Sequence, residues 1–249
     1  MYRLPRSVVD EETGRNIRLN KLERYYLASD SISAKSFELK KDDLKKNGFF
    51  SKDKDEFALF DSSFIDDYSR LKRLAQIITF KDIGSIIAHT GITRDSVVMD
   101  AGSGSGALAC FLAKIVKRVD SFDVKDAHIE VSVRNAKNLK IDNVSFEKKD
   151  VYIDSFKKEE YDVFTLDVPE PKKALKTAVD VLKVGGFLVV YAPHISQVQD
   201  TVVALPKNLV SVKTLEVIER EWNVTEKTLR PATKDFSHTA FLCFIRKIA

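Results

Sequence analysis

The sequence of 249 residues is short of several things, and each shortage excludes a class of protein. It contains two cysteines, Cys110 and Cys243, which lie far apart in apolar segments, so a disulfide framework and a cysteine metal site are both excluded. No apolar run approaches the roughly 20 residues that a membrane helix needs. We therefore expect a protein of a reducing, cytoplasmic setting that does not cross a membrane.

Histidine and excess charge are also scarce. The four histidines show no spacing typical of metal ligands, so we expect no bound metal. Residues 172–249 carry 12 basic and 7 acidic side chains, whereas the two signs nearly balance before them. A solvated lysine-rich face and a surface that attracts a polyanion both remain open as interpretations of this excess.

The chain changes texture along its length, which predicts a small β-rich N-terminal domain over residues 1–70 and a second domain over 71–249. In the first domain, β-prone pieces alternate with Asp, Lys and Gly turns. The expected strands are Asn16–Leu19, Tyr25–Ala28 and Phe57–Phe60. A helix or turn is expected around Lys41–Asn47. This region carries no pattern that resembles a catalytic motif.

From Ser96 onward, strands and helices alternate, which predicts a mostly parallel sheet with right-handed crossovers. The expected strands are 97–99, 118–124, 144–148, 161–166 and 186–192. The expected helices are 81–90, 107–116, 126–139, 171–182 and 195–204. Two last strand-like segments, 210–220 and 239–246, have no helix between them and should form an antiparallel hairpin at the edge. The fold class is α/β, with a Rossmann-like sheet of seven strands.

Glycine is rare, with nine in the chain, yet Gly102, Gly104 and Gly106 fall within five residues. They stand between a buried strand and a helix, where glycine lets the backbone approach a ligand closely. The spacing G-x-G-x-G differs from the dinucleotide pattern G-x-G-x-x-G. Asp100, two residues earlier, suits a cationic sulfonium with an amino-acid tail better than a pyrophosphate. The turn therefore predicts an S-adenosylmethionine site.

Acidic residues at the ends of the next strands complete the predicted site. Asp123 ends the second strand 21 residues after Gly102, close to the ~20 expected for a carboxylate that binds ribose hydroxyls. Asp150 could bind the amino group of the cofactor's adenine, with the Val151 amide beside it. The alternative to a cofactor site is that the glycines only form a tight strand-to-helix turn and that the acidic residues near it bind no ligand. The predicted cofactor-binding residues are Gln76, Asp100, Gly102, Ser103, Gly104, Ser105, Gly106, Ala107, Asp123, Val124, Asp150, Val151 and Asp167.

Asp167 ends the fourth strand and precedes two prolines, Pro169 and Pro171. Ligands of open α/β sheets bind beyond the carboxyl ends of the strands, so Asp167 should face the transferred group and is a candidate catalytic residue. As an alternative it could cap the helix that begins at Pro171, although Glu170 is better placed for that task. Tyr191, at the end of a neighbouring strand, could wall the pocket as a second catalytic residue or merely pack on the sheet.

From about residue 70 to the end, the chain resembles the class I tRNA (adenine-N1)-methyltransferases that modify the T loop. The resemblance is carried, in order, by Lys81-Asp82, Asp100-Ala-Gly-Ser-Gly-Ser-Gly106, Leu166-Asp167-x-Pro169, Tyr191-Ala-Pro-His-Ile-Ser-Gln197-Val198, Arg220-Glu-Trp222, Arg230-Pro231 and His238-Thr-Ala-Phe-Leu242. The segments Arg220-Glu-Trp222 and His238-Thr-Ala-Phe-Leu242 are far more specific than the glycine turn, which all class I methyltransferases share.

The resemblance implies methyl transfer from S-adenosylmethionine to N1 of a tRNA adenine, at position 58 and in some archaeal members also 57. It further implies a homotetramer, and a role for His238 in the site or in a subunit contact. The first domain would then contact tRNA. One departure concerns how the target base is positioned. The family usually has Tyr-Pro before Lys-Asp, and its tyrosine helps to position the base. In this sequence Thr79 and Phe80 stand at those two places.

Three other interpretations compete with this one. A nicotinamide-dependent oxidoreductase would keep Asp123 as the ribose ligand but predicts a G-x-G-x-x-G turn and no acid at Asp100. A non-catalytic RNA-binding subunit predicts a broken glycine motif, whereas the motif here is intact. A methyltransferase that acts on a small molecule or a protein stays open if the C-terminal segments mislead.

Overall fold

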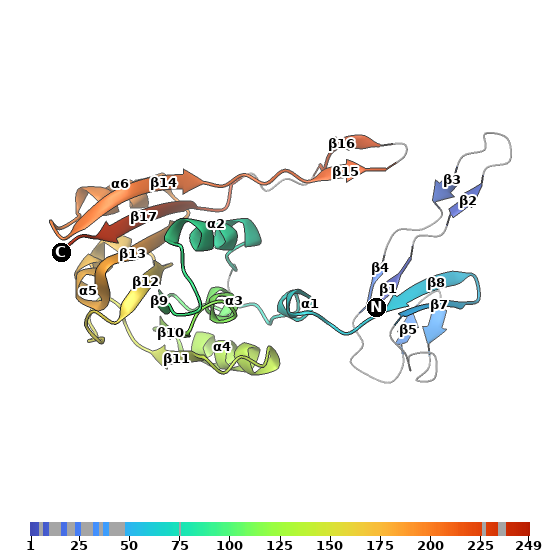
Figure 1. Cartoon of the computed structure of the whole chain (residues 1–249), viewed down its shortest axis with the longest axis horizontal. Helices are drawn as coiled ribbons and strands as arrows, with labels where there is room; N and C mark the ends of the chain where they lie inside the picture. The colour runs from blue at the N-terminus through green and yellow to red at the C-terminus, as the bar shows by residue number, and fades with distance from the viewer. Residues whose placement is uncertain are drawn as a thin grey trace. The chain divides into compact units, whose positions relative to one another are not determined.

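The computed structural model describes residues 1–4, 7–9, 16–18, 23–25, 32–34, 37–39, 48–74, 76–225, 228–233 and 238–249, and for 7–9, 16–18, 32–34 and 37–39 it describes only the backbone. The chain divides into two compact units, Met1–Asp66 and Asp67–Ala249 (Figure 1). The short helix α1 (Phe64–Tyr68) carries the chain from the first unit into the second.

The N-terminal unit is built from β-strands, as its alternating texture predicts. Its main sheet is antiparallel, in the order β4 (Glu23–Arg24), β1 (Tyr2–Arg3), β8 (Asp55–Leu59) and β7 (Gly48–Lys52). Two hairpins pair β2 (Ser7–Val9) with β3 (Asn16–Arg18) and β5 (Ile32–Ala34) with β6 (Phe37–Leu39). The Arg3 guanidinium joins three strands of the main sheet, donating to Glu23 at 2.9 Å and to Asp55 at 2.9 and 3.0 Å.

The expected strands of this unit lie close to the observed ones. The strand expected at Asn16–Leu19 is found as β3, and the one expected at Phe57–Phe60 begins two residues earlier, in β8. Near Tyr25–Ala28 the observed strand β4 ends just before Tyr25, and residues 26–28 lie outside the described residues. The helix or turn expected at Lys41–Asn47 also lies outside them.

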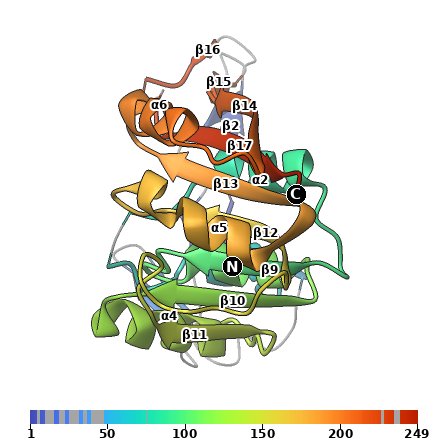
Figure 2. The ribbon, with the colours of Figure 1, turned by 90° about the vertical axis from the view of Figure 1, so that its left-hand side faces the viewer.

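The C-terminal unit holds one sheet of seven strands, the number the sequence predicts (Figure 2). The strands run in the order β11 (Val144–Lys148), β10 (Arg118–Asp123), β9 (Val97–Ala101), β12 (Tyr161–Leu166), β13 (Leu182–Ala192), β17 (Phe241–Lys247) and β14 (Leu209–Glu216). The first five are parallel, and β17 is antiparallel to both of its neighbours. The expected antiparallel edge hairpin is therefore confirmed as β14 and β17.

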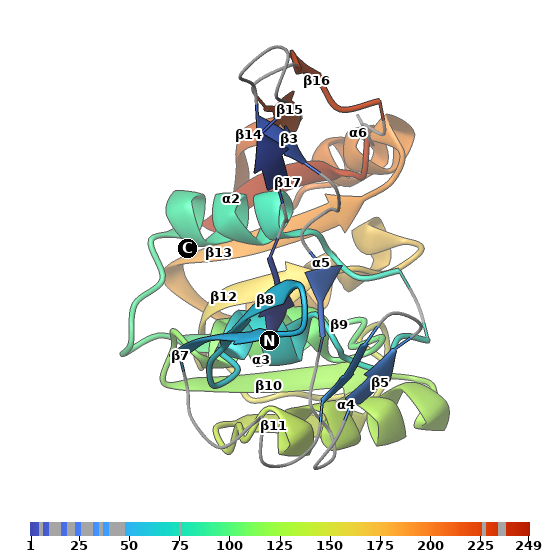
Figure 3. The ribbon, with the colours of Figure 1, turned by 90° about the vertical axis from the view of Figure 1, so that its right-hand side faces the viewer.

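Helices cover both faces of this sheet. On one face lie α2 (Phe80–Thr90), α3 (Ala107–Ala113) and α4 (Asp126–Asn138), and on the other α5 (Leu175–Val181) and α6 (Ile195–Val203) (Figures 2 and 3). The central strands are buried on both sides; every residue of β9 is buried. Gly91 ends α2 in the left-handed conformation with φ 64°, and its amide donates to the Ile87 carbonyl.

Several element boundaries differ from the predicted ones. The helix expected from Pro171 begins as a 3₁₀ turn over Pro171–Ala174 before α5. Strand β13 begins at Leu182 instead of Gly186, because the chain stays extended through an irregularity opposite Tyr161–Val163. Helix α3 ends at Ala113, three residues early. Strand β14 stops at Glu216, and a small ribbon of β15 (Trp222–Val224) and β16 (Leu229–Pro231), which was not predicted, precedes β17.

This topology places the ends of β9, β10 and β12 side by side, with β9 in the middle. The three strands are parallel, so the loops that follow them leave the sheet at the same edge. Among the described residues, no helix is both long enough and apolar enough to cross a membrane.

Candidate active site

The glycine turn after β9 is held by close backbone contacts that only glycine permits. Gly102 has φ 93°, and a Cβ built on it would lie 2.0 Å from the carbonyl oxygen of Asp167. Gly106 has φ 72°, and a Cβ there would lie 2.8 Å from the Cβ of Ser132. The Gly102 amide donates to Phe122 O at 2.9 Å. The loops after β9 and β12 therefore pack backbone to backbone, and any side chain at Gly102 would separate them.

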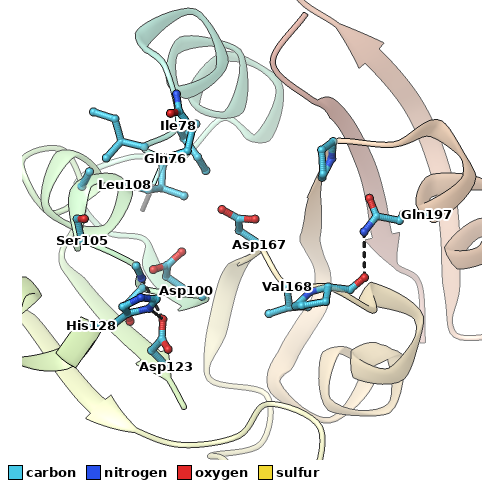
Figure 4. A pocket seen from close by; sticks show the side chains of 17 residues that line it. Gln76, Ile78, Asp100, Ser105, Leu108, Asp123, His128, Asp167, Val168 and Gln197 are labelled. Atoms are coloured by element: carbon cyan, nitrogen blue, oxygen red, sulfur yellow. Dashed lines mark hydrogen bonds and ion pairs between the residues drawn. The ribbon is translucent and has the colours of Figure 1, made fainter. Parts of the chain in front are cut away.

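A cleft opens beyond these strand ends, made of two adjoining cavities of about 350 Å³ and about 230 Å³. Figure 4 shows the side chains that line the larger cavity. The two cavities share the residues on the boundary between them, which are Gly102, Asp123, His128, Asp167, Val168 and Pro169. The larger volume lies within the range of small-molecule and cofactor sites. The cleft therefore has room for a cofactor in one part and a second group beside it.

The structure brings together most of the residues predicted from the sequence. Nine of them line the larger cavity: Gln76, Asp100, Gly102, Ser103, Gly104, Ser105, Ala107, Asp123 and Asp167. Three further predicted residues, Val124, Asp150 and Val151, line the smaller cavity. Gly102, Asp123 and Asp167 line both. Gly106 is not among the lining residues and stands at the start of α3. Tyr191 is not among the lining residues, and burial, followed by the charge of Asp82, raises the pKa of its phenol to about 12.

Asp123 is the best-held carboxylate of the cleft. Its Oδ2 accepts from the Gly104 amide at 3.0 Å and lies 2.9 Å from His128 Nδ1, while its Oδ1 accepts from the Lys125 amide at 3.0 Å. These bonds fix the carboxylate at the mouth of the glycine turn. Oδ1 has a second lone pair, which is the geometry that a ribose hydroxyl needs.

Asp100 lies beneath the cleft and is almost completely buried. The Ser121 hydroxyl donates to Asp100 Oδ2 at 2.6 Å, and the Thr165 hydroxyl donates to Oδ1 at 2.7 Å. Burial raises the pKa of the Asp100 carboxyl, the two hydroxyl hydrogen bonds oppose that rise, and the charge of Asp123 adds to it. Asp100 thus ties β9 to β10 and β12 and adds a third carboxyl group to the lining of the cleft, beside Asp123 and Asp167.

The Asp167 carboxylate points into the space between the two walls of the cleft (Figure 4). Burial, followed by the charges of Asp100 and Asp123, raises its pKa to about 7. Among the described residues, none donates a hydrogen bond to this carboxylate. Asp167 is therefore an acceptor aimed at whatever enters the cleft. In the same described part of the chain, no group of three or more His, Cys, Asp or Glu side chains could hold a metal ion.

Several lining residues escaped the sequence analysis. His128 is not among the residues predicted for the site, although its place five residues after Asp123, in the first turn of α4, could have suggested their hydrogen bond. Gln197 donates from Nε2 to the Pro169 carbonyl at 2.9 Å and accepts from the His194 amide at 3.1 Å, so it joins the loops after β12 and β13. The apolar part of the wall carried no sequence signal: Ile77, Ile78, Leu108 and Val168.

Comparison with known proteins gives a consistent result. Residues 68–240 match the model of the family described as "tRNA methyltransferase complex GCD14 subunit". The chain is 31% identical over 220 residues to the tRNA (adenine(57)-N(1)/adenine(58)-N(1))-methyltransferase TrmI of Methanocaldococcus jannaschii, covering 76% of this chain and 78% of the relative. It is 33% identical over 182 residues to the tRNA (adenine(58)-N(1))-methyltransferase TrmI of Thermus thermophilus, covering 71% of each.

A solved structure shows the same fold. The crystal structure of the tRNA (m1A58) methyltransferase TrmI from Aquifex aeolicus superimposes with a TM-score of 0.77 at 22% identity, covering 100% of this chain and 96% of that one. The arrangement found here, with a β-rich unit before a Rossmann-like sheet, is therefore present in a solved protein along its whole length.

Proposed function

The chain belongs to the family of tRNA methyltransferase subunits that matches residues 68–240, and we propose that it transfers a methyl group from S-adenosylmethionine to N1 of a T-loop adenine in tRNA. The target is position 58, with position 57 as a second target, since the relatives carry these two specificities in their names. The observation that carries the proposal is the Asp167 carboxylate, which projects into the cleft beside the glycine turn with no donor from the described residues.

The donor set of the cleft fits S-adenosylmethionine, which supplies an electrophilic methyl group on a cationic sulfur. The turn at Gly102 lets a ligand approach the backbone, and Asp123 presents Oδ1 to a ribose hydroxyl. Asp150 and Val151 line the smaller cavity, where the adenine of the cofactor would lie. The carboxylates near the cleft favour a cation over a phosphate, which is the discrimination that this cofactor requires.

Asp167 acts on the acceptor. Adenine N1 carries an in-plane lone pair, so it forms the new N–C bond without losing a proton first, while the departing sulfur keeps the electron pair of the broken bond. Positive charge then spreads to the 6-amino group of the base. A carboxylate that accepts a hydrogen bond from this amino group gains strength as that charge grows, and a contact that strengthens in the transition state raises turnover.

Incubation of the protein with unmethylated tRNA and labelled S-adenosylmethionine, followed by nucleoside analysis, tests this function. The expected product is 1-methyladenosine from the T loop, and an adenine-to-guanine substitution at position 58 should remove the part formed there. Label in another nucleoside, or in no nucleoside, would contradict the proposal. The same assay separates it from the non-catalytic RNA-binding alternative, which predicts tRNA binding without transfer.

We further propose that the N-terminal unit contacts the tRNA, that the protein works in the cytoplasm and that it assembles as a homotetramer. The unit carries its own small core of Met1, Phe57 and Leu59, and none of its described residues lines the cleft. For assembly, the support besides the family resemblance is apolar surface on the β15–β16 ribbon, where Val224 and Leu229 are 70% and 76% exposed. Light scattering that gives the mass of a monomer would refute the tetramer.

A further inference from the structure

Part of the cleft wall belongs to a segment that has no helix or strand of its own. Gln76, Ile77 and Ile78 line the larger cavity, and Figure 4 shows Gln76 and Ile78 on one wall of the cleft. Residues 72–74 and 76–78, which we call the strap, lie between α1 and α2, outside any helix or strand. Contacts with other segments must therefore hold the strap in place.

Asn135, on α4, holds the first residue of the strap. Asn135 is 1% exposed, and its side-chain Oδ1 accepts from the Lys72 amide at 3.1 Å while Nδ2 donates to the Lys72 carbonyl at 2.9 Å. Nδ2 also donates to the Ser105 carbonyl, in the glycine turn, at 2.9 Å. One side-chain amide thus joins the strap to the glycine turn. Neither an apolar side chain nor a carboxylate could donate twice and accept once at this position.

Ser105 makes a second connection between the strap and the glycine turn. Its hydroxyl oxygen accepts from the Leu74 amide at 2.9 Å, and Ser105 itself lines the larger cavity. Directional hydrogen bonds therefore fix residues 72–74 against the turn. Gln76, the first residue of the strap that lines the cleft, follows two positions after Leu74.

The strap is also held where it enters α2. The Thr79 carbonyl accepts from the Asp82 and Ile83 amides at 3.1 and 3.0 Å, and the Thr79 hydroxyl donates to Asp82 Oδ2 at 2.9 Å. The Thr239 hydroxyl donates to the same oxygen at 2.7 Å, which ties this end to the chain just before β17. The cleft-lining residues of the strap therefore lie between two fixed ends.

Asn135 is not among the residues that line the cleft, so it can act on a ligand only through the strap and the glycine turn. We propose that Asn135 is a positioning residue, whose amide holds the strap against the glycine turn in the arrangement that encloses S-adenosylmethionine. A wall that is ordered in advance costs no affinity when the cofactor binds, whereas a loose wall must be ordered at that moment. This inference rests on the S-adenosylmethionine site of the proposed function and not on the identity of the methyl acceptor.

Calorimetry with S-adenosylhomocysteine tests this role in the full-length protein. Asn135→Ala should weaken binding on the order of 10-fold, the scale for lost hydrogen bonds that had ordered a segment in advance. In single-turnover methylation of tRNA, the half-saturating concentration of S-adenosylmethionine should rise by a similar factor. The rate at saturating cofactor should fall by less than about 2-fold, because the strap contributes to cofactor binding and not to the transfer step.

Limited proteolysis of the cofactor-free protein reports on the strap itself. Lys72 and Arg73 are exposed, so trypsin can cut after either residue once the strap leaves the glycine turn. Asn135→Ala should be cut there on the order of 10-fold faster than the wild type, because the cleavage rate follows the population of the open form. Mass spectrometry identifies the resulting fragments, and saturating S-adenosylhomocysteine should slow their formation.

Asn143→Ala is the matched control. The Asn143 side-chain amide also donates to backbone carbonyls, at 2.8, 3.0 and 3.3 Å, but Asn143 lies just before β11 and lines no part of the cleft. This variant should lower the melting temperature and leave cofactor affinity and trypsin cleavage of the strap within about 2-fold of the wild type. If Asn135→Ala does not fold, Ser105→Ala removes the Leu74 hydrogen bond alone and takes its place in the trypsin assay.

The outcomes separate this inference from the proposed function. A wild-type protein that binds no S-adenosylhomocysteine overturns both. A wild-type protein that binds it but methylates no tRNA overturns the proposed function alone, since affinity and cleavage still test the strap. An Asn135→Ala variant with wild-type affinity, or with wild-type cleavage when free of cofactor, overturns the positioning role. So does an Asn143→Ala variant that loses affinity by the same factor, because the loss would then follow general stability.

Discussion

The raised pKa of Asp167 should make methyl transfer depend on pH in the neutral range. Burial and the charges of Asp100 and Asp123 bring this pKa to about 7, and the proposed contact needs the ionised form. The ionised fraction rises from about one tenth near pH 6 to about nine tenths near pH 8. With both substrates well below saturation, the rate reports the free enzyme and should therefore rise roughly 10-fold between these pH values.

Substitution at Asp167 identifies the group that titrates. Asp167→Asn keeps the shape and one acceptor oxygen but cannot ionise, so its profile should be nearly flat and its rate should lie between those of the wild type and the alanine variant. Asp167→Ala should lower the single-turnover rate by about 10²–10³, the range for one preorganised electrostatic contact. Saturating S-adenosylmethionine places a cation near the carboxylate and should move the midpoint of the wild-type profile to lower pH.

Two results would refute this account of Asp167. An Asn variant with the wild-type slope would mean that another group titrates. An Ala variant that transfers methyl groups at the wild-type rate would reduce Asp167 to a loop-stabilising residue, and the acceptor contact would have to be sought at Tyr191. Calorimetric binding of S-adenosylhomocysteine to each variant supplies the control, since much of the cofactor affinity should remain.

Three substitutions and one truncation test the glycine turn, the ribose contact and the role of the N-terminal unit. Gly102→Ala should lower the melting temperature and weaken S-adenosylhomocysteine binding by more than about 10-fold, because the added Cβ would meet the Asp167 carbonyl. In contrast, Gly84→Ala has open space around the added Cβ inside α2 and should add about 0.5–1 kcal/mol of stability. Asp123→Ala should weaken S-adenosylhomocysteine binding measured by calorimetry by about 10-fold or more, and unchanged affinity would remove the ribose contact. A chain that begins at Tyr68 should still bind S-adenosylhomocysteine but lose tRNA affinity in a filter assay, and equal tRNA affinity would count against the role of the N-terminal unit.

Local patterns allowed most of the C-terminal unit to be predicted. Short buried runs bounded by charged or glycine residues identified β9 and β12, and isoleucines at helical spacing with Gly91 behind them identified α2. The glycine turn and Asp123 were predictable for the same reason: both stand next to the end of a recognisable strand, and parallel strands bring such ends together.

What escaped prediction depends on contacts between distant segments. The hydrogen bonds of Asp82 to Thr239 span 157 positions in the chain, and no local pattern records them. The ribbon of β15 and β16 has only three residues in each strand, too few for a periodicity to show. The extension of β13 back to Leu182 depends on pairing with β12, where Tyr161 lies opposite Leu182, and no local pattern before Gly186 records this pairing.

The acidic residues at the strand ends also explain how the cleft can serve both substrates. Three parallel strands bring Asp100, Asp123 and Asp167 together, and their mutual repulsion contributes to the raised pKa values of Asp100 and Asp167. A cation among them relieves this repulsion. The reaction moves one positive charge from the cofactor's sulfur to the methylated adenine, so the charge shifts within the cleft toward Asp167 and is not lost. A site that favours a cation at both ends would therefore hold the cofactor and also stabilise the charge that develops on the base, and only the second interaction, which grows in the transition state, would raise turnover.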